Sequence, residues 1–494
     1  MDSLTSVAAR NQSSMILYTT GLVALSLSYA LYRLLALPSH LRHLPSVPIW
    51  PIVLSYARQE PDDVRIKRLL LPYANKHSEG VVLVWVFGQW MVHILDPQLA
   101  FQVNANLRDF PKYFPPWDLL LLRFTGRKNI VTTNGDEWRK ISTLIHDAFT
   151  IPVPVDVFTS LAKKLFHVIE QTTSTSGDDH KVNWADLAQR YALDAIGYSV
   201  AGYNIDAIST ESQLANDYNT FMRHTADPLY LALPILEKII PRKHVFDLMN
   251  NIKDKLADML LAKRLDPGQD IMSFMLRDPT LTKDELRDNI STLFIAGHDT
   301  TAGALSMLIY YLAVDQISQK SAREEVIRVL GPSADPSLPL LSANALPYVS
   351  ACIKEALRNN TPVSYAVPRI SGKAVNLGKY YIPSGTAVIT NIYGVHHNES
   401  VWKDASVFRP ERFLTGEDTN QVKHSWIPFN GGPRRCPAQN FAQYELRTLA
   451  SMLLREYEWT LPEDSIHANG IKNAFSPFAL TVPHDLDIIF RKRT

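Results

Sequence analysis

The chain has 494 residues, of which 46% are apolar and 20% are charged, a composition typical of a packed globular protein. Its formal net charge is +1, so no overall field favours binding to nucleic acid or to an acidic partner. The two cysteines, Cys352 and Cys436, argue for a reducing compartment and against a disulfide-stapled secreted protein. Two cysteines also exclude zinc and iron–sulfur sites that need four.

An apolar run begins at Met15, carries no charge as far as Tyr32 and continues through leucines to residue 37. This is close to the length needed to cross a bilayer. We therefore expect an anchor helix at about residues 15–37 within an N-terminal region of residues 1–37. A cleaved signal peptide is the competing interpretation, because residues 28–30 resemble a cleavage site.

Basic residues such as Arg33 and Arg42 follow the apolar run, whereas the segment before it is weakly charged. By the positive-inside rule, the body of the protein should face the cytoplasm. Prolines at positions 45, 48 and 51 predict a stiff, non-helical linker over residues 38–51. The remainder, residues 52–494, is the expected main domain.

Within that domain, residues 81–86 and 90–95 have the pattern of two β-strands joined through Gly88. Asp96 and Pro97 then begin a helix, since proline is favoured in a first helical turn. Further helical patterns occupy most of the later sequence. The predicted fold class is therefore mostly α with a small β region, or α+β.

A long helix should begin at Thr282, which forms a capping box with Glu285. In its middle stands the run from Ala296 to Thr301, Ala-Gly-His-Asp-Thr-Thr. Small residues, an acid and hydroxyls are unusual in a buried helix, and the glycine alone costs about 1 kcal/mol relative to alanine. The run indicates either a packing groove with a satisfied acid or a functional site.

The second unusual stretch ends in Cys436, which stands at the expected start of a helix spanning residues 439 to about 457. The helix dipole and the neighbouring Arg434 and Arg435 should favour the thiolate, a soft ligand suited to iron. A lone cysteine is otherwise most often a small buried hydrophobe.

Phe429, Gly432, Arg434 and Cys436 form the pattern F-x-x-G-x-R-x-C, which resembles the cysteine loop of the cytochrome P-450 family of haem-thiolate monooxygenases. The resemblance implies that Cys436 is the proximal iron ligand and that Phe429 packs beside its sulfur. It also implies that Gly432 lies in a tight turn and that Arg434 contacts a haem propionate. Ala438 departs from the family, which usually has glycine at this position.

The run at residues 296–301 resembles the family motif A-G-x-D-T-T. By this resemblance, Ala296 and Gly297 would let the haem and dioxygen approach the helix. Asp299 and Thr300 would be catalytic and relay protons during oxygen activation.

Other family positions are matched in order along the chain. Trp138 and Arg369 would contact the propionates, and His396 would contact the haem. Ser142 stands where the family usually has an arginine, so Arg139 or Lys140 could supply the missing cation.

Glu355 and Arg358 share a helix face because they are three residues apart. The family pairs this E-x-x-R with a later arginine, here Arg412, in a structural triad. Without that resemblance, the pair would be an ordinary surface salt bridge.

The resemblance implies one cytochrome P-450 domain that binds haem b and inserts one oxygen atom into an apolar small molecule. Because too little sequence follows Cys436 for flavin domains, electrons should come from NADPH through a separate membrane-bound reductase, with cytochrome b5 as a further candidate donor. Arg139, Lys140 and Arg435 would form the docking face. The expected location is the endoplasmic reticulum membrane, single-pass, with the catalytic domain in the cytoplasm.

The details most resemble fungal microsomal members, which favours oxidation of terpenoid-like secondary metabolites. Fatty-acid or xenobiotic hydroxylation is the alternative within the same chemistry. Two other classes stay open, namely a haem-thiolate isomerase or dehydratase that needs no dioxygen, and a haem-binding carrier or sensor.

Overall fold

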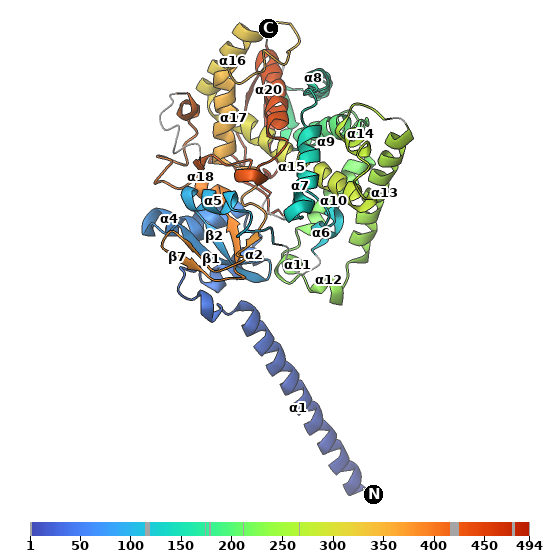
Figure 1. Cartoon of the computed structure of the whole chain (residues 1–494), viewed down its shortest axis with the longest axis vertical. Coiled ribbons are helices and arrows are strands. Elements are labelled where there is room, and N and C mark those ends of the chain that lie inside the picture. The colour runs from blue at the N-terminus through green and yellow to red at the C-terminus, as the bar shows by residue number, and fades with distance from the viewer. Residues whose placement is uncertain are drawn as a thin grey trace.

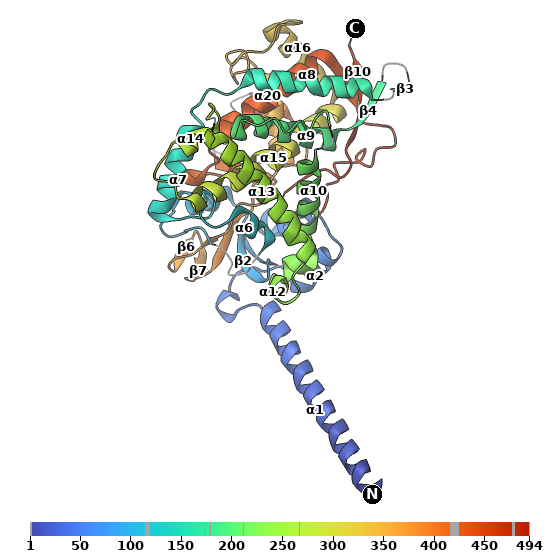
Figure 2. The same ribbon diagram turned by 90° about the vertical axis from the view of Figure 1, so that its right-hand side faces the viewer.

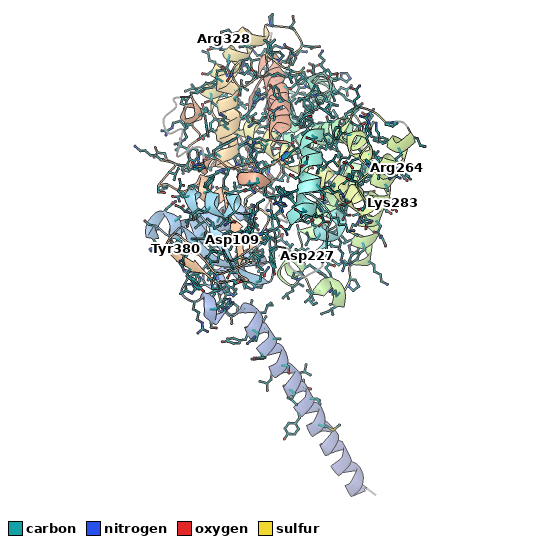
Figure 3. The ribbon with its side chains drawn as sticks, viewed as in Figure 1. Asp109, Asp227, Arg264, Lys283, Arg328 and Tyr380 are labelled. Carbon is teal, nitrogen blue, oxygen red and sulfur yellow. The ribbon has the colours of Figure 1, made fainter. Side chains whose placement is uncertain are left out.

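The structure is a computed structural model that describes residues 2–113, 119–172, 174–176, 179–210, 212–265, 267–414, 424–476 and 480–493 (Figure 1). A long N-terminal helix, α1 (Asp2–Leu35), projects away from the body (Figures 1 and 3), and at its C-terminal end Leu34 and Leu35 pack against the core. Among the described residues, Tyr18–Leu41 is the one segment long and apolar enough to cross a membrane.

The body is built mainly from helices. Their bounds are α2 (Ile49–Ala57), α3 (Asp62–Arg65), α4 (Leu71–His77), α5 (Pro97–Ala105), α6 (Leu120–Thr125), α7 (Gly135–Ala148), α8 (Val155–Gln171), α9 (Trp184–Ile196), α10 (Gln213–Thr225), α11 (Pro228–Ala232), α12 (Leu236–Ile239), α13 (Lys243–Leu265), α14 (Ile271–Leu276), α15 (Lys283–Val314), α16 (Gln316–Leu330), α17 (Pro347–Asn359), α18 (Ile392–His396) and α20 (Gln439–Glu456). Short 3-10 and π segments complete the set at Ser39–Leu41, Ile66–Leu70, Gly197–Ala201, Pro410–Phe413 and Gly432–Arg434.

The strands form three small sheets. Their bounds are β1 (Val81–Val86), β2 (Gln89–Ile94), β3 (Ser174–Ser176), β4 (Asp179–Asn183), β5 (Arg369–Ile370), β6 (Val375–Leu377), β7 (Tyr380–Ile382), β8 (Ala387–Thr390), β9 (Tyr457–Thr460) and β10 (Asp487–Lys492). The sheet orders are β1-β2-β8-β5, β3-β4-β10-β9 and β6-β7. All six residues of β1 are buried, which explains its unbroken apolar sequence.

The helical core forms around α15, which runs through the middle of the body (Figures 1 and 2). α9 packs along α15, while α17 and α20 pack against it elsewhere. Buried apolar residues from α8, α17, α20 and parts of α9 and α15 form one continuous cluster. Because α15 contacts so many elements, its middle is held firmly where the sequence carries its unusual polar run.

The predicted fold class is confirmed. The capping box at Thr282 forms as expected, and α15 begins at the next residue. Gly88 joins β1 to β2 with a φ of +75°, a backbone conformation that glycine adopts without strain.

Residues 38–51 differ from the predicted non-helical linker. Leu41, Leu44 and Val47 are buried, and the Val47 N–H donates to the Leu83 carbonyl across 2.9 Å. α2 already begins at Ile49. The prolines favour extended backbone, as expected, but the alternating apolar side chains dock this segment onto the sheet.

Candidate active site

The candidate site is a cavity of about 330 Å³ between the middle of α15 and the loop that precedes α20. One wall contains Ala296, Gly297, Thr300 and Thr301, and the opposite wall contains Phe429 and Cys436. Most of the other lining side chains are apolar, among them Val363, Val367 and Leu446. Residues more than a hundred positions apart in the sequence thus enclose one apolar space. Of the two cysteines, Cys436 lines this space and Cys352 does not.

The cysteine loop is closed by its own backbone. The N–H of Cys436 donates to the carbonyl of Phe429 across 2.9 Å. Gly432 has a φ of +69°, and a Cβ at this position would collide with the backbone oxygen of Asn104 in α5. Only glycine satisfies both the turn and the close approach of α5, which is why the loop can present its cysteine to the cavity.

Burial controls the thiol of Cys436. It raises the pKa of this thiol to about 11, although a backbone N–H of Ala438 and the charge of Arg435 act in the opposite direction. The backbone at the helix start and Arg435 therefore act on the thiol in the expected direction, toward the thiolate, but burial outweighs them. A metal at this sulfur would have to displace the proton, as is usual for cysteine ligands.

On the opposite wall, Gly297 allows α15 to pack closely on α9. A Cβ on Gly297 would collide with the side chain of Ile196. The glycine therefore meets a packing demand and also lines the cavity, so the packing interpretation describes part of the run at 296–301. Thr300 donates its hydroxyl hydrogen to the Ala296 carbonyl across 2.6 Å, which places Oγ1 against the helix backbone.

Asp299 does not line this cavity among the described residues, although its neighbour Thr300 does. Its Oδ2 accepts a hydrogen bond of 2.5 Å from the hydroxyl of Tyr218 in α10. Its Oδ1 lies 3.5 Å from Nδ1 of His298. Burial raises the pKa of the Asp299 carboxyl. The two predicted catalytic residues are thus adjacent in sequence but face different spaces.

Arg434 spans the edge of the cavity. It donates to the carbonyls of Ile130 and Thr133 across 3.1 and 2.6 Å, and its guanidinium lies 4.2 Å from the ring centroid of Trp138. Burial lowers the pKa of Arg434 to about 9. Arg434 and Trp138, which are each predicted to contact a haem propionate, are therefore in direct contact with each other.

Lys112 and Arg369 stand beside this pair on neighbouring backbone segments, which form an isolated antiparallel bridge. Arg369 donates to the Phe110 carbonyl across 2.7 Å, and Lys112 donates to the Val367 carbonyl across 3.0 Å. Burial, followed by the charges of Arg369 and Arg434, holds the pKa of Lys112 well below its usual range. Three cationic side chains are thus gathered in one buried region.

Three donors in this region have no hydrogen-bond partner among the described residues, namely Arg369 Nη2, Arg434 Nε and Trp138 Nε1. A buried cation that lacks a counter-charge is strongly unfavourable. An anionic group bound here would supply a negatively charged acceptor to Arg434 and Trp138, which line the cavity, and to Arg369, which is not among the described lining residues. The two carboxylates of a haem have the required charge, so the residues present fit a haem whose iron meets Cys436.

The proposed replacements for the cation missing at Ser142 lie elsewhere. Arg139 pairs with Asp136 at the surface, and Lys140 pairs with Glu285 across 3.0 Å. Ser142 itself lines the cavity. Lys112 is the additional cation that the structure brings to this region, and it comes from a segment that the sequence analysis did not single out.

His396 is not among the described residues that line the cavity, contrary to its expected haem contact. Its Nε2 accepts from the backbone N–H of Ile427 across 2.9 Å, and its carbonyl accepts from Arg358. Burial lowers the pKa of His396 to about 3, so the ring is a neutral acceptor. The histidine links the cysteine-loop segment to α17 instead.

Glu355, Arg358 and Arg412 are brought together away from the cavity. Arg358 makes two hydrogen bonds of 2.8 Å to the carboxylate of Glu355, and Arg412 Nε donates to the same carboxylate across 3.2 Å. Glu355 and Arg358 are completely buried. Arg358 also donates to the carbonyls of His396 and Ala405, so this cluster fastens the segment that leads to the cysteine loop.

Glu445 is another residue that the sequence analysis missed. It lines the cavity from α20, and its Oε1 has no partner among the described residues. Burial raises its pKa to about 8. The available sequence signal was its position on the buried, leucine-rich face of the helix, where a glutamate is unusual.

Comparison with known proteins agrees with this geometry. The family model for cytochrome P-450 matches residues 44–483. The cytochrome P-450 monooxygenase xanG of Aspergillus fumigatus is 26% identical over 91% of this chain and 88% of its own length. The chloroplastic carotene epsilon-monooxygenase of Arabidopsis thaliana is 27% identical over 76% of this chain and 74% of its own length. Cytochrome P-450 4A10 of Rattus norvegicus is 35% identical, over 41% of this chain and 37% of its own length.

Among solved structures, the haem domain of cytochrome P450DA superimposes with a TM-score of 0.78 at 22% identity, over 91% of this chain and 98% of that domain. This likeness confirms the fold. The family match extends over most of the chain and includes both walls of the cavity. The chain belongs to the cytochrome P-450 family and is a monooxygenase of the oxidoreductase class.

Proposed function

We propose that the protein binds haem b in the cavity and inserts one oxygen atom from dioxygen into an apolar small molecule, by hydroxylation or epoxidation. The observation that carries this proposal is the cavity that joins Cys436 to the small residues of α15, with cationic donors at its edge that have no partner among the described residues. Cys436 would be the axial ligand of the iron. Arg434, Arg369, Lys112 and Trp138 would hold the propionates.

When bound, the haem would supply oxygen activation, which an axial thiolate favours by donating electron density. The residues of this chain would position the haem and the substrate, shield them from water and supply protons. Ala296 and Gly297 would leave room above the haem plane, and the mainly apolar lining would exclude water. Thr300 and Asp299 would hold and move the protons that the reaction consumes.

The cavity lining supports an apolar substrate, because Val363, Val367 and Leu357 offer few hydrogen-bonding groups. The favoured substrates are terpenoid-like compounds of fungal secondary metabolism, and the similarity to a cytochrome P-450 monooxygenase of Aspergillus fumigatus supports the fungal part of this assignment. Hydroxylation of fatty acids or xenobiotics is the alternative within the same chemistry.

The test is reconstitution of the full-length protein with NADPH and a separate cytochrome P-450 reductase, with and without cytochrome b5. A panel of terpene hydrocarbons, fatty acids and aromatic polyketides would be screened for products heavier by one oxygen atom. Incorporation of label from ¹⁸O₂ is the expected result. Conversion of a compound without NADPH or dioxygen would overturn the proposal in favour of an isomerase or dehydratase.

Replacing Lys112 with methionine should weaken haem retention without unfolding the haem-free protein. The substitution removes one of three crowded cations, so it relieves repulsion in the haem-free state and loses a charge-assisted hydrogen bond in the haem-bound state. Such bonds contribute about 1.5–3 kcal/mol, or about ten- to a hundredfold in affinity. The measurement is the rate of haem transfer from the purified protein to an excess of a haem-binding acceptor protein.

The matched control is Arg139→Met, which removes the same charge from an exposed ion pair outside the cavity. Haem transfer from this control should match the wild type. Equal transfer rates for Lys112→Met and Arg139→Met would contradict the role proposed for Lys112.

We also propose that α1 anchors the protein in the endoplasmic reticulum membrane, with the catalytic domain in the cytoplasm. Support comes from the apolar helix that projects from the body and from an exposed apolar rim beside its exit. The rim consists of Trp50, Leu54, Leu229, Ile235, Ile239 and Ile240. α11 contacts α2, and in both views α2 and α12 lie at the end of the body from which α1 leaves (Figures 1 and 2). The rim would touch the same lipid surface that α1 enters.

A protein that lacks residues 1–37 should therefore still bind lipid vesicles, more weakly than the full chain. Replacing both Ile239 and Ile240 with aspartate in this truncated protein should abolish the remaining binding, since each isoleucine loses about 1.5–3 kcal/mol of burial and each charge adds a desolvation cost. Vesicle cosedimentation measures the effect. The control is Ile317→Asp, which changes an exposed isoleucine on α16. An equal loss of vesicle binding in this control would contradict the proposed membrane contact of the rim.

The three residues predicted to form the reductase-docking face differ in their surroundings. Arg139 and Lys140 are engaged by Asp136 and Glu285, whereas Arg435 is exposed beside the cysteine loop. We propose Arg435 as the contact residue of this set, because it combines exposure with closeness to the predicted iron ligand.

A further inference from the structure

The end of α1 has backbone groups that the helix itself does not satisfy. Leu34 and Leu35 are its last two residues, and Pro38 follows shortly after. The last carbonyls of any helix lack a donor within the helix. The carbonyl of Leu34 would take its donor from residue 38 if the helix continued, but proline has no N–H. The end of α1 therefore needs hydrogen-bond donors from another part of the protein.

Two buried tryptophans supply these donors. Trp85 Nε1 donates to the Leu34 carbonyl across 3.1 Å, and Trp90 Nε1 donates to the Leu35 carbonyl across 3.1 Å. Trp85 and Trp90 are paired directly across the β1–β2 hairpin, so their indoles lie on the same face of the sheet. Consecutive carbonyls of the helix are thus capped by a pair of side chains from two neighbouring strands.

Apolar packing and backbone pairing hold the same junction. Leu34, Leu35 and Leu37 pack against the buried cluster that contains all of β1. Farther along, the N–H of Leu83 in β1 donates to the carbonyl of Pro45 across 2.8 Å. The chain from the end of α1 onward therefore follows the edge of the sheet, where a loose tether would make no such contacts.

This sheet also reaches the candidate active site. β2 pairs with β8 through Val92 and Val388, and β8 pairs with β5 through Val388 and Arg369. Arg369 is one of the residues that we assign to the propionates. In both views α1 leaves the body at the end where β2 lies (Figures 1 and 2). One hydrogen-bonded sheet thus connects the end of α1 to a residue of the proposed haem site.

We propose that Trp85 and Trp90 clamp the end of the membrane helix to the β1–β2 hairpin, so that α1 and the body move as one rigid unit. This inference rests on the proposed membrane anchoring and does not depend on oxygen insertion. Two capped carbonyls and three packed leucines prevent the helix from pivoting about its last turn. The clamp therefore fixes the tilt of the body on the bilayer and keeps the rim against the lipid.

Tryptophan suits this position because it combines a large apolar ring with one N–H donor. The end of a membrane helix lies at an apolar boundary, where a carbonyl without a donor is costly. Phenylalanine at positions 85 and 90 would preserve most of the apolar contact but leave the carbonyls of Leu34 and Leu35 without these donors. The end of α1 should then leave the sheet to find water.

The distance between two spin labels tests the clamp in the full-length, haem-loaded protein in lipid nanodiscs. Leu25→Cys in α1 and Lys76→Cys near the end of α4 place both labels at exposed positions. Cys352 is buried and Cys436 is the proposed iron ligand, so the added cysteines should take the labels. Double electron–electron resonance should give one narrow distance distribution. A broad distribution in this protein, with both tryptophans present, would overturn the clamp.

Replacing both tryptophans with phenylalanine should broaden the distribution. Hydrogen exchange of the Val47 N–H, which donates to the Leu83 carbonyl, should accelerate about two- to tenfold for each lost bond. The matched control is Trp459→Phe, which removes a buried indole donor bonded to the Ile309 carbonyl across 3.0 Å. This control should leave both measurements unchanged.

Unchanged distances and exchange in Trp85→Phe/Trp90→Phe would overturn the clamp, as would equal changes in the control. If the double variant does not fold, Trp90→Phe alone gives the same comparison, with one lost bond.

Membrane retention separates the clamp from the anchoring on which it rests. Every variant should stay in the membrane fraction after washing with alkaline carbonate, because the apolar length of α1 is unchanged. Release of the wild type by this wash would reject the anchoring itself. Retention of the wild type together with a broad label distance would reject the clamp and leave the anchoring intact.

Discussion

Replacing Cys436 with alanine should abolish both the absorption band of a thiolate-ligated ferrous–carbon monoxide haem and all reductase-supported turnover. The reason is that one described cysteine lines the cavity, and its sulfur is the only soft ligand the cysteine loop offers. The loop itself should persist, because its closing hydrogen bond runs between the Cys436 N–H and the Phe429 carbonyl and involves no side chain. Far-ultraviolet circular dichroism should therefore match the wild type.

Cys352→Ala is the matched control. Cys352 is completely buried in α17, where burial raises the pKa of its thiol well above the usual range. It should behave as a small hydrophobe, so its replacement should leave the carbon monoxide band intact. A normal band in Cys436→Ala, or its loss in Cys352→Ala alone, would refute the proposed ligand.

Features carried by neighbouring residues could be predicted from sequence. The capping box at Thr282 and the turn at Gly432 each depend on a few adjacent positions, and the structure contains both. The contact of Arg358 with Glu355 follows from helical spacing alone. The contact of Arg412 with this pair could be predicted only from the family pattern, because nothing in the local sequence of either segment indicates that the two segments meet.

The grouping of Lys112 with Arg369 and Arg434 could not be predicted from local pattern. Ser142 left a missing cation, and the nearest candidates along the helix were Arg139 and Lys140. On α7, however, Arg139 pairs with Asp136 and Lys140 pairs with Glu285, while the segment at Lys112 is brought in by a backbone bridge to Arg369. A replacement charge is selected by tertiary contact, so closeness in sequence was a poor guide.

The orientation of Asp299 was within reach of the sequence. Adjacent residues on a helix point in different directions, so Asp299 and Thr300 could not both face one cavity squarely. The partner of Asp299, Tyr218, was not within reach, since α10 lies about eighty positions earlier in the chain. The thiol of Cys436 shows a related difficulty, because the sequence displays the nearby arginines but not the burial that outweighs them.

Replacing Glu355 with glutamine should strongly destabilise the protein although the residue lies outside the cavity. Glu355 is completely buried and accepts hydrogen bonds from Arg358, Arg412, Asn359 and the Arg409 backbone. Glutamine has nearly the same size but no charge, so the buried guanidinium of Arg358 would lose its counter-ion. Breaking a buried pair from one side costs about 3–5 kcal/mol, a large part of the 5–15 kcal/mol that typically holds a domain folded.

Chemical denaturation of the haem-loaded protein measures this loss, with haem release as a second signal. The control is Glu324→Gln, since Glu324 and Lys320 form an exposed pair on α16 that should contribute about 0–1 kcal/mol. Haem release should precede or accompany unfolding in Glu355→Gln, because Arg358 also binds the carbonyl of His396, whose ring accepts from Ile427 just before the cysteine loop. If the denaturation midpoint of Glu355→Gln equalled that of Glu324→Gln, the cysteine loop would be held by other contacts. The buried charges would then serve no structural purpose.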